Sequence, residues 1–112
     1  MQVTAHHQGE IAIVTLVGQL DAVTAQAVRQ AFAQYGGDGN FHALVDLGRV
    51  TFIDSSGLAA LISGLKTFRA HGRDFVLAAV QPSVLQVFTL TMLDRAFRIF
   101  PDTQTAIDAM AT

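Results

Sequence analysis

Residues 41–71, FHALVDLGRVTFIDSSGLAALISGLKTFRAH, decide the fold, because they contain an apolar strand, a sharp break and a long helix in succession. The strand is FHALVDL at residues 41–47, and a continuous apolar run of this kind is typical of a strand that is buried on both faces. Gly48 to Ile53 lead to the break, Asp-Ser-Ser-Gly, at residues 54–57. The apolar side chains beyond the break recur at helical spacing: they are Leu58, Leu61, Ile62, Leu65 and Phe68.

Two strands are predicted upstream of this segment. Residues 2–7 can form a short edge strand. Residues 11–17, IAIVTLV, form a stronger one, because β-branched residues favour strands. We expect Gly18 to end that strand.

A helix is predicted between these strands and residue 41. Asp21 or Thr24 is expected to cap it, because short polar side chains accept hydrogen bonds from the free N–H groups of a first turn. Gly36-Gly37 is expected to stop it in the left-handed conformation. Its apolar side chains are Val23, Ala27, Val28, Ala31, Phe32 and Tyr35.

Downstream, His71-Gly72 end the long helix, and residues 74–80, DFVLAAV, predict another buried strand. Pro82 suits the first turn of a third helix, where a missing N–H costs nothing. The apolar side chains expected on that helix are Val84, Leu85, Phe88 and Met92. Residues 96–100 predict a last short strand. Pro101 and Asp102 then open a final helix with Ala106, Ile107 and Met110.

The alternation of strands and helices predicts the fold class. Consecutive parallel strands need crossover helices, so this order favours an α/β domain. We expect a four- to five-stranded mixed sheet packed against about four helices. The 112 residues match the size of one domain, so residues 1–112 are expected to form a single one.

The composition excludes several classes of protein. Hydrophobic residues make up 51% and charged residues 14%, which is not the composition of a disordered chain. The net charge is −2 and the seven Lys and Arg are scattered, so direct nucleic-acid binding has little electrostatic support. The chain contains no cysteine and no apolar run long enough to span a bilayer, so we expect a cytoplasmic protein that does not insert into membranes.

The break at residues 54–57 is the strongest candidate site. Asp54 or Ser55 can simply cap the helix, which is worth about 1 kcal/mol. The same geometry suits a phosphate on Ser55, because a helix N-terminus carries about half a positive charge and free N–H groups. A phosphate would add roughly −1.5 to −2 charges, and repulsion from each like charge at ~6 Å is worth roughly 3 kcal/mol at an effective dielectric of ~20. Such a change can release a partner without unfolding the domain.

Motifs in order along most of the chain resemble the STAS-domain anti-sigma factor antagonists of bacteria. Each motif alone is weak, but their order and spacing together are fairly specific. The matching residues are Gly18-Gln19-Leu20-Asp21, Val45-Asp46-Leu47, Thr51-Phe52-Ile53-Asp54-Ser55-Ser56-Gly57-Leu58, Gly72-Arg73-Asp74, Pro82-Ser83-Val84 and Met92-Leu93.

The resemblance implies a STAS fold and a partner-switching function. In that family the unphosphorylated antagonist binds an anti-sigma factor and frees its sigma factor. The anti-sigma factor is also a serine kinase, and a serine phosphatase reverses the phosphorylation. Carried onto this sequence, the acceptor is Ser55 and the acidic neighbours that shape docking are Asp21 and Asp54, with Ser56 and Gly57 at the contact. The protein is then a substrate, not an enzyme, and no cofactor is expected.

The small side chains of the same helix form a second candidate contact. Ser56, Ala59, Ala60 and Ser63 allow close approach of a partner, although they also suit an ordinary solvated face. The family often has another Gly where this chain has Ala59-Ala60, and Glu where it has Gln19. A methyl group at position 59 or 60 can narrow the range of partners.

Other functions are left as alternatives. A STAS domain can also be a subunit of a lipid-transport ABC complex, a transporter tail on a separate chain, or a sensor of nucleotides or other small ligands. His6 and His7 are adjacent on a strand and point to opposite faces, so we expect no metal site there. The chain lacks the Gly-x-Ser-x-Gly elbow of serine hydrolases, so catalysis by Ser55 or Ser56 is not expected.

Overall fold

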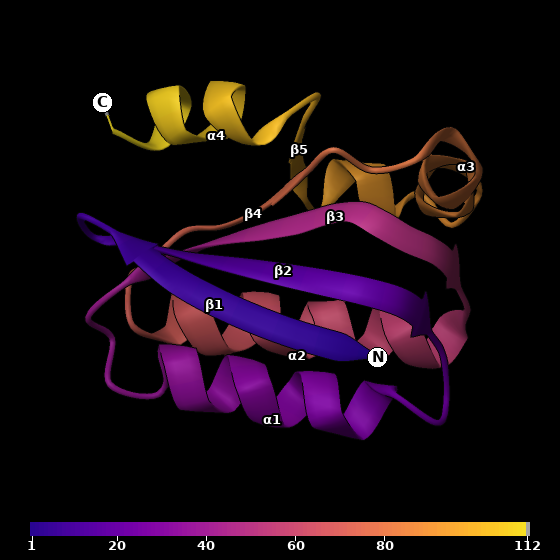
Figure 1. The fold of residues 1–112 in the computed structure, drawn as a ribbon, viewed down its shortest axis with the longest axis horizontal. Helices are drawn as coiled ribbons and strands as arrows, with labels where there is room; N and C mark the ends of the chain where they lie inside the picture. The colour runs from indigo at the N-terminus through magenta and orange to yellow at the C-terminus, as the bar shows by residue number, and fades with distance from the viewer. Residues whose placement is uncertain (112) are drawn as a thin grey trace.

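The computed structural model describes residues 1–111, which form five strands, four α-helices and one short 3-10 helix (Figure 1). Among the described residues, no helix combines the length and the hydropathy that a membrane span requires. The elements in chain order are β1 (Gln2–Gln8), β2 (Ile11–Leu20), α1 (Ala25–Gly36), β3 (His42–Ile53), α2 (Ser55–Ala70), β4 (Phe75–Ala78), α3 (Pro82–Leu90), the 3-10 helix (Leu93–Arg95), β5 (Arg98–Phe100) and α4 (Thr103–Met110).

The five strands form one mixed sheet in the order β1-β2-β3-β4-β5. β1 is antiparallel to β2, and every later pair is parallel. A helix connects each parallel pair, as the alternation of the sequence predicts. The predicted α/β fold with a four- to five-stranded mixed sheet and four helices is confirmed.

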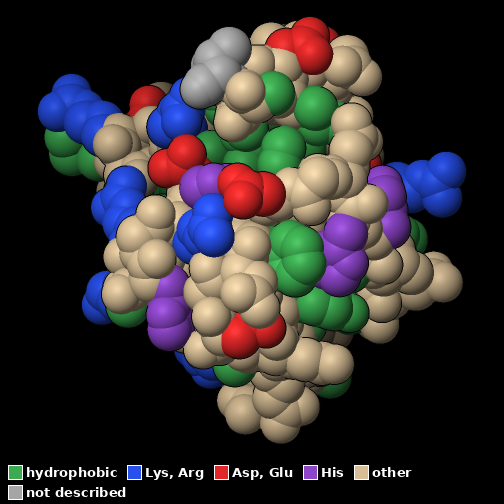
Figure 2. Space-filling model, turned by 90° about the vertical axis from the view of Figure 1, so that its left-hand side faces the viewer, with side chains coloured by type: hydrophobic (Ala, Val, Ile, Leu, Met, Phe, Trp, Pro, Cys, Tyr) green, Lys and Arg blue, Asp and Glu red, His purple; other side chains and the backbone are tan. Residues whose placement is uncertain are grey.

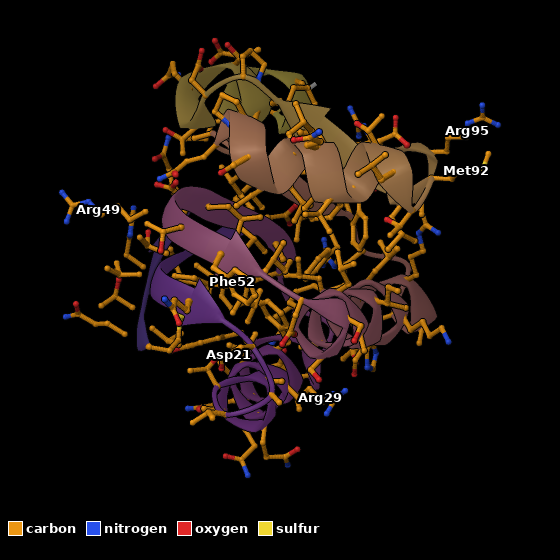
Figure 3. All side chains as sticks on the ribbon, turned by 90° about the vertical axis from the view of Figure 1, so that its right-hand side faces the viewer. Asp21, Arg29, Arg49, Phe52, Met92 and Arg95 are labelled. Atoms are coloured by element: carbon orange, nitrogen blue, oxygen red, sulfur yellow. The ribbon has the colours of Figure 1, made fainter. Side chains whose placement is uncertain are left out.

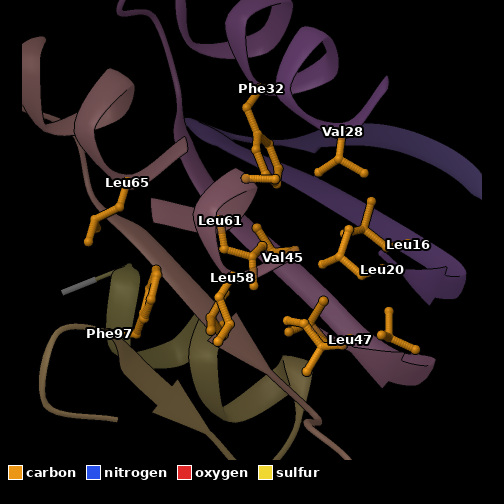
Figure 4. Close-up of a cluster of buried hydrophobic side chains, with 14 of the residues drawn as sticks. Leu16, Leu20, Val28, Phe32, Val45, Leu47, Leu58, Leu61, Leu65 and Phe97 are labelled. Atoms are coloured by element: carbon orange, nitrogen blue, oxygen red, sulfur yellow. The ribbon is translucent and has the colours of Figure 1, made fainter. Parts of the chain in front are cut away.

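Helices α1 and α2 lie side by side against one face of the sheet, and α4 lies against the other (Figure 1). The larger core fills the space between the sheet, α1 and α2, and α3 adds Val84 and Phe88 to it (Figure 4). The smaller core lies under α4. Its buried side chains are Ile11, Ile13, Leu44, Val76, Ala78 and Ala106.

Strands β2 and β3 are both longer than the apolar runs indicate. Gly18 has φ 123° and lies next to a register shift, but β2 continues past it to Leu20. β3 continues through Gly48 to Ile53. The prediction that Gly18 ends its strand is therefore wrong, because parallel pairing between β2 and β3 extends as far as Leu20 and Ile53. Both strands consequently end at the same edge of the sheet.

Two turns also differ from the prediction. Gly37 has φ −67°, so α1 does not end in a left-handed glycine, and Gly39 at φ 73° makes the turn instead. β4 covers only four residues of the predicted 74–80, because Ala79 at φ 61° turns the chain out of the sheet.

Three residues that helical spacing predicts to be apolar contacts are exposed, and one of them is Ala27 on α1. Val23 is 89% exposed, because α1 begins only at Ala25. Met92 is 57% exposed, because the chain leaves α3 after Leu90 and Met92 adopts φ 63°. The prediction that these side chains pack into the core is therefore wrong.

Candidate functional site

Ser55 is the first residue of α2, and its side chain is exposed. The preceding Asp54 has an extended backbone, and its carboxylate accepts a hydrogen bond of 3.0 Å from the N–H of Gly57. The carbonyl of Asp54 accepts the first helical hydrogen bond, 2.9 Å, from the N–H of Leu58. The helix cap is therefore Asp54, and the Ser55 hydroxyl is left facing solvent.

Gly57 brings the first turn of α2 against the end of β2. A Cβ at this position would overlap the carbonyl oxygen of Leu20 and would lie 2.9 Å from the Cγ1 of Ile53. The same Leu20 carbonyl accepts a hydrogen bond of 3.2 Å from the N–H of Asp54. Only glycine fits this contact, which fixes where the helix tip lies relative to the sheet.

Two N–H groups of the first turn remain open. Within residues 1–111, neither the N–H of Ser55 nor that of Ser56 has a hydrogen-bond acceptor. Free N–H groups at a helix start, together with the helix dipole, favour an anion at this place. The tip of α2 can therefore hold added negative charge without losing a contact within the chain.

Asp21 lies at the same edge of the sheet as Asp54. Each follows directly after one residue of the pair Leu20–Ile53, so the parallel register sets the two acids beside each other. Figure 3 shows Asp21 at this edge of the molecule, with Phe52 on the end of β3.

The carboxylate of Asp21 is used within its own turn. It accepts hydrogen bonds from the N–H groups of Val23 at 3.0 Å and Thr24 at 3.2 Å. Thr24 occupies the cap position of α1 but makes no side-chain capping bond, and its hydroxyl donates instead to the carbonyl of Gln19 at 2.8 Å. Asp21 is thus a half-buried residue that shapes the loop before α1.

The structure divides the predicted small face of α2 into surface and core. Ser56, Ala59 and Ser63 are half-buried, so part of each reaches solvent. Gly57 is buried, and Ala60 is fully buried in the larger core. Burial limits access to these two positions, and the expected contact of Gly57 and Ala60 with a partner stays a prediction.

Phe52 is an exposed aromatic residue that the sequence reasoning did not assign to the site. Its side chain is 47% exposed at the end of β3, near the start of α2. The signal available in the sequence was weak. Phe52 continues an apolar run, and nothing in that run indicates that the end of the strand is exposed to solvent. Phe52 therefore places an exposed apolar side chain beside the edge that holds Asp21 and Asp54.

A separate hollow of about 370 Å³ lies at the opposite end of the molecule, between the β1–β2 turn and the end of α4. Figure 2 shows this end, with an apolar patch bordered by charged and histidine side chains. Two of its lining residues, Glu10 and His42, contact neighbouring loops. Arg73 lies 3.8 Å from Glu10 and donates to the carbonyl of Gly39 at 2.7 Å. His42 accepts a hydrogen bond of 2.9 Å from the N–H of Asp74. These contacts fasten the loops to each other.

The described residues contain no group of three or more His, Cys, Asp or Glu side chains placed to hold a metal ion. His6 and His7 are both exposed on β1, and the ring of His7 stacks on Phe41 with centroids 4.1 Å apart.

Comparison with known proteins identifies the family of this chain. The family model that describes the STAS domain matches residues 2–106. The chain is 27% identical over 84 residues to the anti-sigma-B factor antagonist of Listeria monocytogenes. This match covers 75% of this chain and 74% of that protein. It is 26% identical to a solved anti-sigma factor antagonist from Mycobacterium paratuberculosis, with a TM-score of 0.90 over 99% of this chain and 94% of the other. A solved protein of Thermotoga maritima has the same fold, with 22% identity, a TM-score of 0.92 and coverage of 98% and 95%. The chain therefore belongs to the STAS-domain family and is related to its anti-sigma factor antagonists.

Proposed function

We propose that this chain is an anti-sigma factor antagonist controlled by phosphorylation of Ser55. In its unphosphorylated form it binds an anti-sigma factor that is also a serine kinase, and thereby frees a sigma factor. Phosphorylation of Ser55 ends the binding, and a serine phosphatase restores it. The protein is a substrate of these enzymes. The observation that carries the proposal is the exposed hydroxyl of Ser55 at the start of α2, directly after the Asp54 cap.

The first step of the argument is access. A kinase must reach the hydroxyl oxygen, which attacks the terminal phosphorus of ATP while ADP leaves. Ser55 is exposed, and no side-chain hydrogen bond within residues 1–111 occupies its hydroxyl. Ser56, the next hydroxyl, is half-buried. The position therefore favours transfer to Ser55 over Ser56.

The second step is the effect on the fold. The cap bond from Gly57 to Asp54 does not involve Ser55, so a phosphate on Ser55 leaves it in place. The open N–H groups of the first turn stabilise a negative group there. We therefore expect a phosphorylated domain with the same structure and nearly the same stability.

The third step is the effect on binding. The phosphate brings roughly −1.5 to −2 charges to an edge that already holds Asp21 and Asp54. An acidic group of a docked partner at ~6 Å is repelled by roughly 3 kcal/mol per charge at an effective dielectric of ~20. That energy corresponds to a loss of affinity of about a hundredfold. Charge alone is thus sufficient for a switch.

The test combines phosphorylation with binding. The chain is incubated with ATP and each ATP-dependent anti-sigma factor encoded near its gene, and the intact mass and the modified site are measured. We expect one phosphate on Ser55, no phosphate on Ser55→Ala, and normal modification of the matched control Ser56→Ala. In binding titrations Ser55→Ala should keep its affinity and Ser55→Asp should lose affinity.

Two results contradict the proposal. If Ser55→Ala loses all binding while its circular dichroism is unchanged, the serine is a contact residue and not a switch. If none of these kinases modifies or binds the chain, the domain serves another partner, such as a transport complex.

A further inference from the structure

A second feature of the surface lies between α1 and α2, away from the tip of α2. The two helices leave an open groove of about 430 Å³. The hydroxyl of Thr67 donates to the carbonyl of Ser63 at 3.0 Å, so it turns back onto its own helix. The groove therefore combines the apolar side chains of Ala59 and Ile62 with polar and charged ones. Its lining residues are Arg29, Ala59, Ile62, Ser63, Lys66 and Thr67.

The charge of these two helices is opposite to that of the rest of the chain. α1 and α2 contain three of the seven cationic side chains, Arg29, Lys66 and Arg69, and none of the nine acidic ones. Within residues 1–111, none of the three forms an ion pair. Two of them, Arg29 and Lys66, line the groove itself. A chain with a net charge of −2 thus carries a groove with unpaired positive charge.

We infer that this groove binds an acidic segment of the partner protein, in which carboxylates flank an apolar side chain. The carboxylates pair with Arg29 and Lys66, and the apolar side chain lies on Ala59 and Ile62. This inference rests on the proposed function, since it describes how that partner docks. Complementary charge steers the encounter, and contact with Ala59 and Ile62 adds apolar burial.

The form of the site favours a protein segment over other anionic partners. A groove that combines Ala59 and Ile62 with two cations can accept an apolar side chain flanked by carboxylates, whereas a membrane surface or a nucleic acid needs a dense, outward-facing cationic patch. Three cations spread over two helices do not make such a patch.

The groove also lies within reach of the proposed switch. Ala59 is one helical turn from Ser55, about 6 Å along the axis, whereas Thr67 is about 18 Å away. α1 and α2 run in the same direction, and Arg29 lies in the second turn of α1, so it also faces this near end (Figures 1 and 3). A phosphate on Ser55 therefore repels the carboxylate paired with Arg29 more strongly than the one at Lys66, since screening acts over about 8 Å.

The test uses a designed peptide as the probe. The peptide is a 14-residue amidated helix of Glu, Ala and Leu, with a stripe of Leu flanked by Glu, and a control peptide has Gln at every Glu. Each is titrated into isotope-labelled protein and followed by amide chemical shifts. We expect the acidic peptide to shift the amides of Ala59, Ile62, Ser63 and Lys66, and the control peptide to bind at least several-fold more weakly.

Variants of the protein complete the test. Arg29→Gln/Lys66→Gln should weaken peptide binding by about two- to thirty-fold, the range for two surface ion pairs. The matched control is Arg49→Gln/Arg95→Gln, which removes the same charge from two exposed residues away from the groove (Figure 3). It should bind as the parent does.

Each outcome decides the inference. Equal binding of both peptides, shifts outside the groove, or an unchanged affinity of Arg29→Gln/Lys66→Gln overturns it. So does binding to phosphatidylglycerol vesicles when the acidic peptide fails to bind. Ser55→Glu separates the two proposals: if the groove variants lose the peptide while Ser55→Glu keeps it at low salt, the groove stands and the switch at Ser55 falls.

Discussion

Replacing Gly57 by alanine tests how the tip of α2 is held. Helix propensity alone predicts that the change stabilises the protein by about 0.5–1 kcal/mol. The structure predicts the reverse sign, because the new Cβ would overlap the carbonyl oxygen of Leu20 and would lie 2.9 Å from the Cγ1 of Ile53. A backbone carbonyl cannot rotate away as a flexible side chain does, so the helix start must move.

The size of the effect follows from three contributions. Overpacking of this kind costs about 1–3 kcal/mol, and disturbing the hydrogen bond from Asp54 to Leu20 costs about 1 kcal/mol more. The higher helix propensity of alanine offsets about 0.5–1 kcal/mol of this loss. We expect a net loss of about 1–3 kcal/mol, which lowers the urea midpoint by about 0.5–2 M.

Urea denaturation followed by circular dichroism measures the change. Ala59→Gly, on the same turn of the helix, calibrates the propensity and should itself lose about 0.5–1 kcal/mol. The parent and both variants are then compared as phosphorylation substrates, since a displaced tip carries Ser55 with it. A stability of Gly57→Ala equal to or above that of the parent would refute the packing argument.

Three further predictions concern other parts of the fold. Ala79→Gly should raise the free energy of unfolding by about 1 kcal/mol, because it relieves a positive φ of 61° in a residue with a Cβ, and a loss of stability in denaturation would contradict this. Phe88→Ala should cost about 3–5 kcal/mol and Met92→Ala less than about 0.5 kcal/mol, because Phe88 is fully buried and Met92 is 57% exposed; similar losses in thermal unfolding would show that Met92 packs in solution. The pKa of Asp102 is lowered by the hydrogen bond from the backbone N–H of Thr105, 2.7 Å long, and then by the Thr105 side chain. A lowered folded-state pKa means that its stabilisation is present above the unfolded value of 3.8 and is lost as the pH falls through the folded value. The stability advantage over Asp102→Asn should therefore shrink at lower pH, and an advantage that grows on acidification would contradict the assignment.

Much of the fold follows from local patterns that a single sequence already contains. The break at Asp54 can be predicted because a capping residue, two serines and a glycine separate a buried strand from apolar side chains at helical spacing. Pro82 likewise marks the first turn of α3. These features need no knowledge of the rest of the chain.

What sequence reasoning missed depends on contacts between distant segments. Gly18 reads as a strand breaker, but the pairing of β2 with β3 carries the strand past it. Ala60 reads as part of a small exposed face, and only the packing of the sheet against α2 shows that it is buried. The groove at Arg29 was also missed, because its lining comes from two helices separated by a strand.

The position of a phosphate on α2 decides what it does to an acidic partner. On the proposed mechanism, a phosphate at Ser55 would lie outside the groove, beside N–H groups that stabilise it, and would repel the partner's nearest carboxylate. At Ser63 the same phosphate would lie in the groove that Arg29 and Lys66 also line, and it would compete with the partner's own carboxylates. The first arrangement weakens binding by repulsion, which added salt screens, whereas the second would block it by occupancy, which salt relieves much less. Salt also weakens the ion pairs at Arg29 and Lys66, so the informative quantity is the ratio of the affinities of the unphosphorylated and phosphorylated chains. If added salt fails to bring this ratio closer to one, the repulsive switch at Ser55 is excluded.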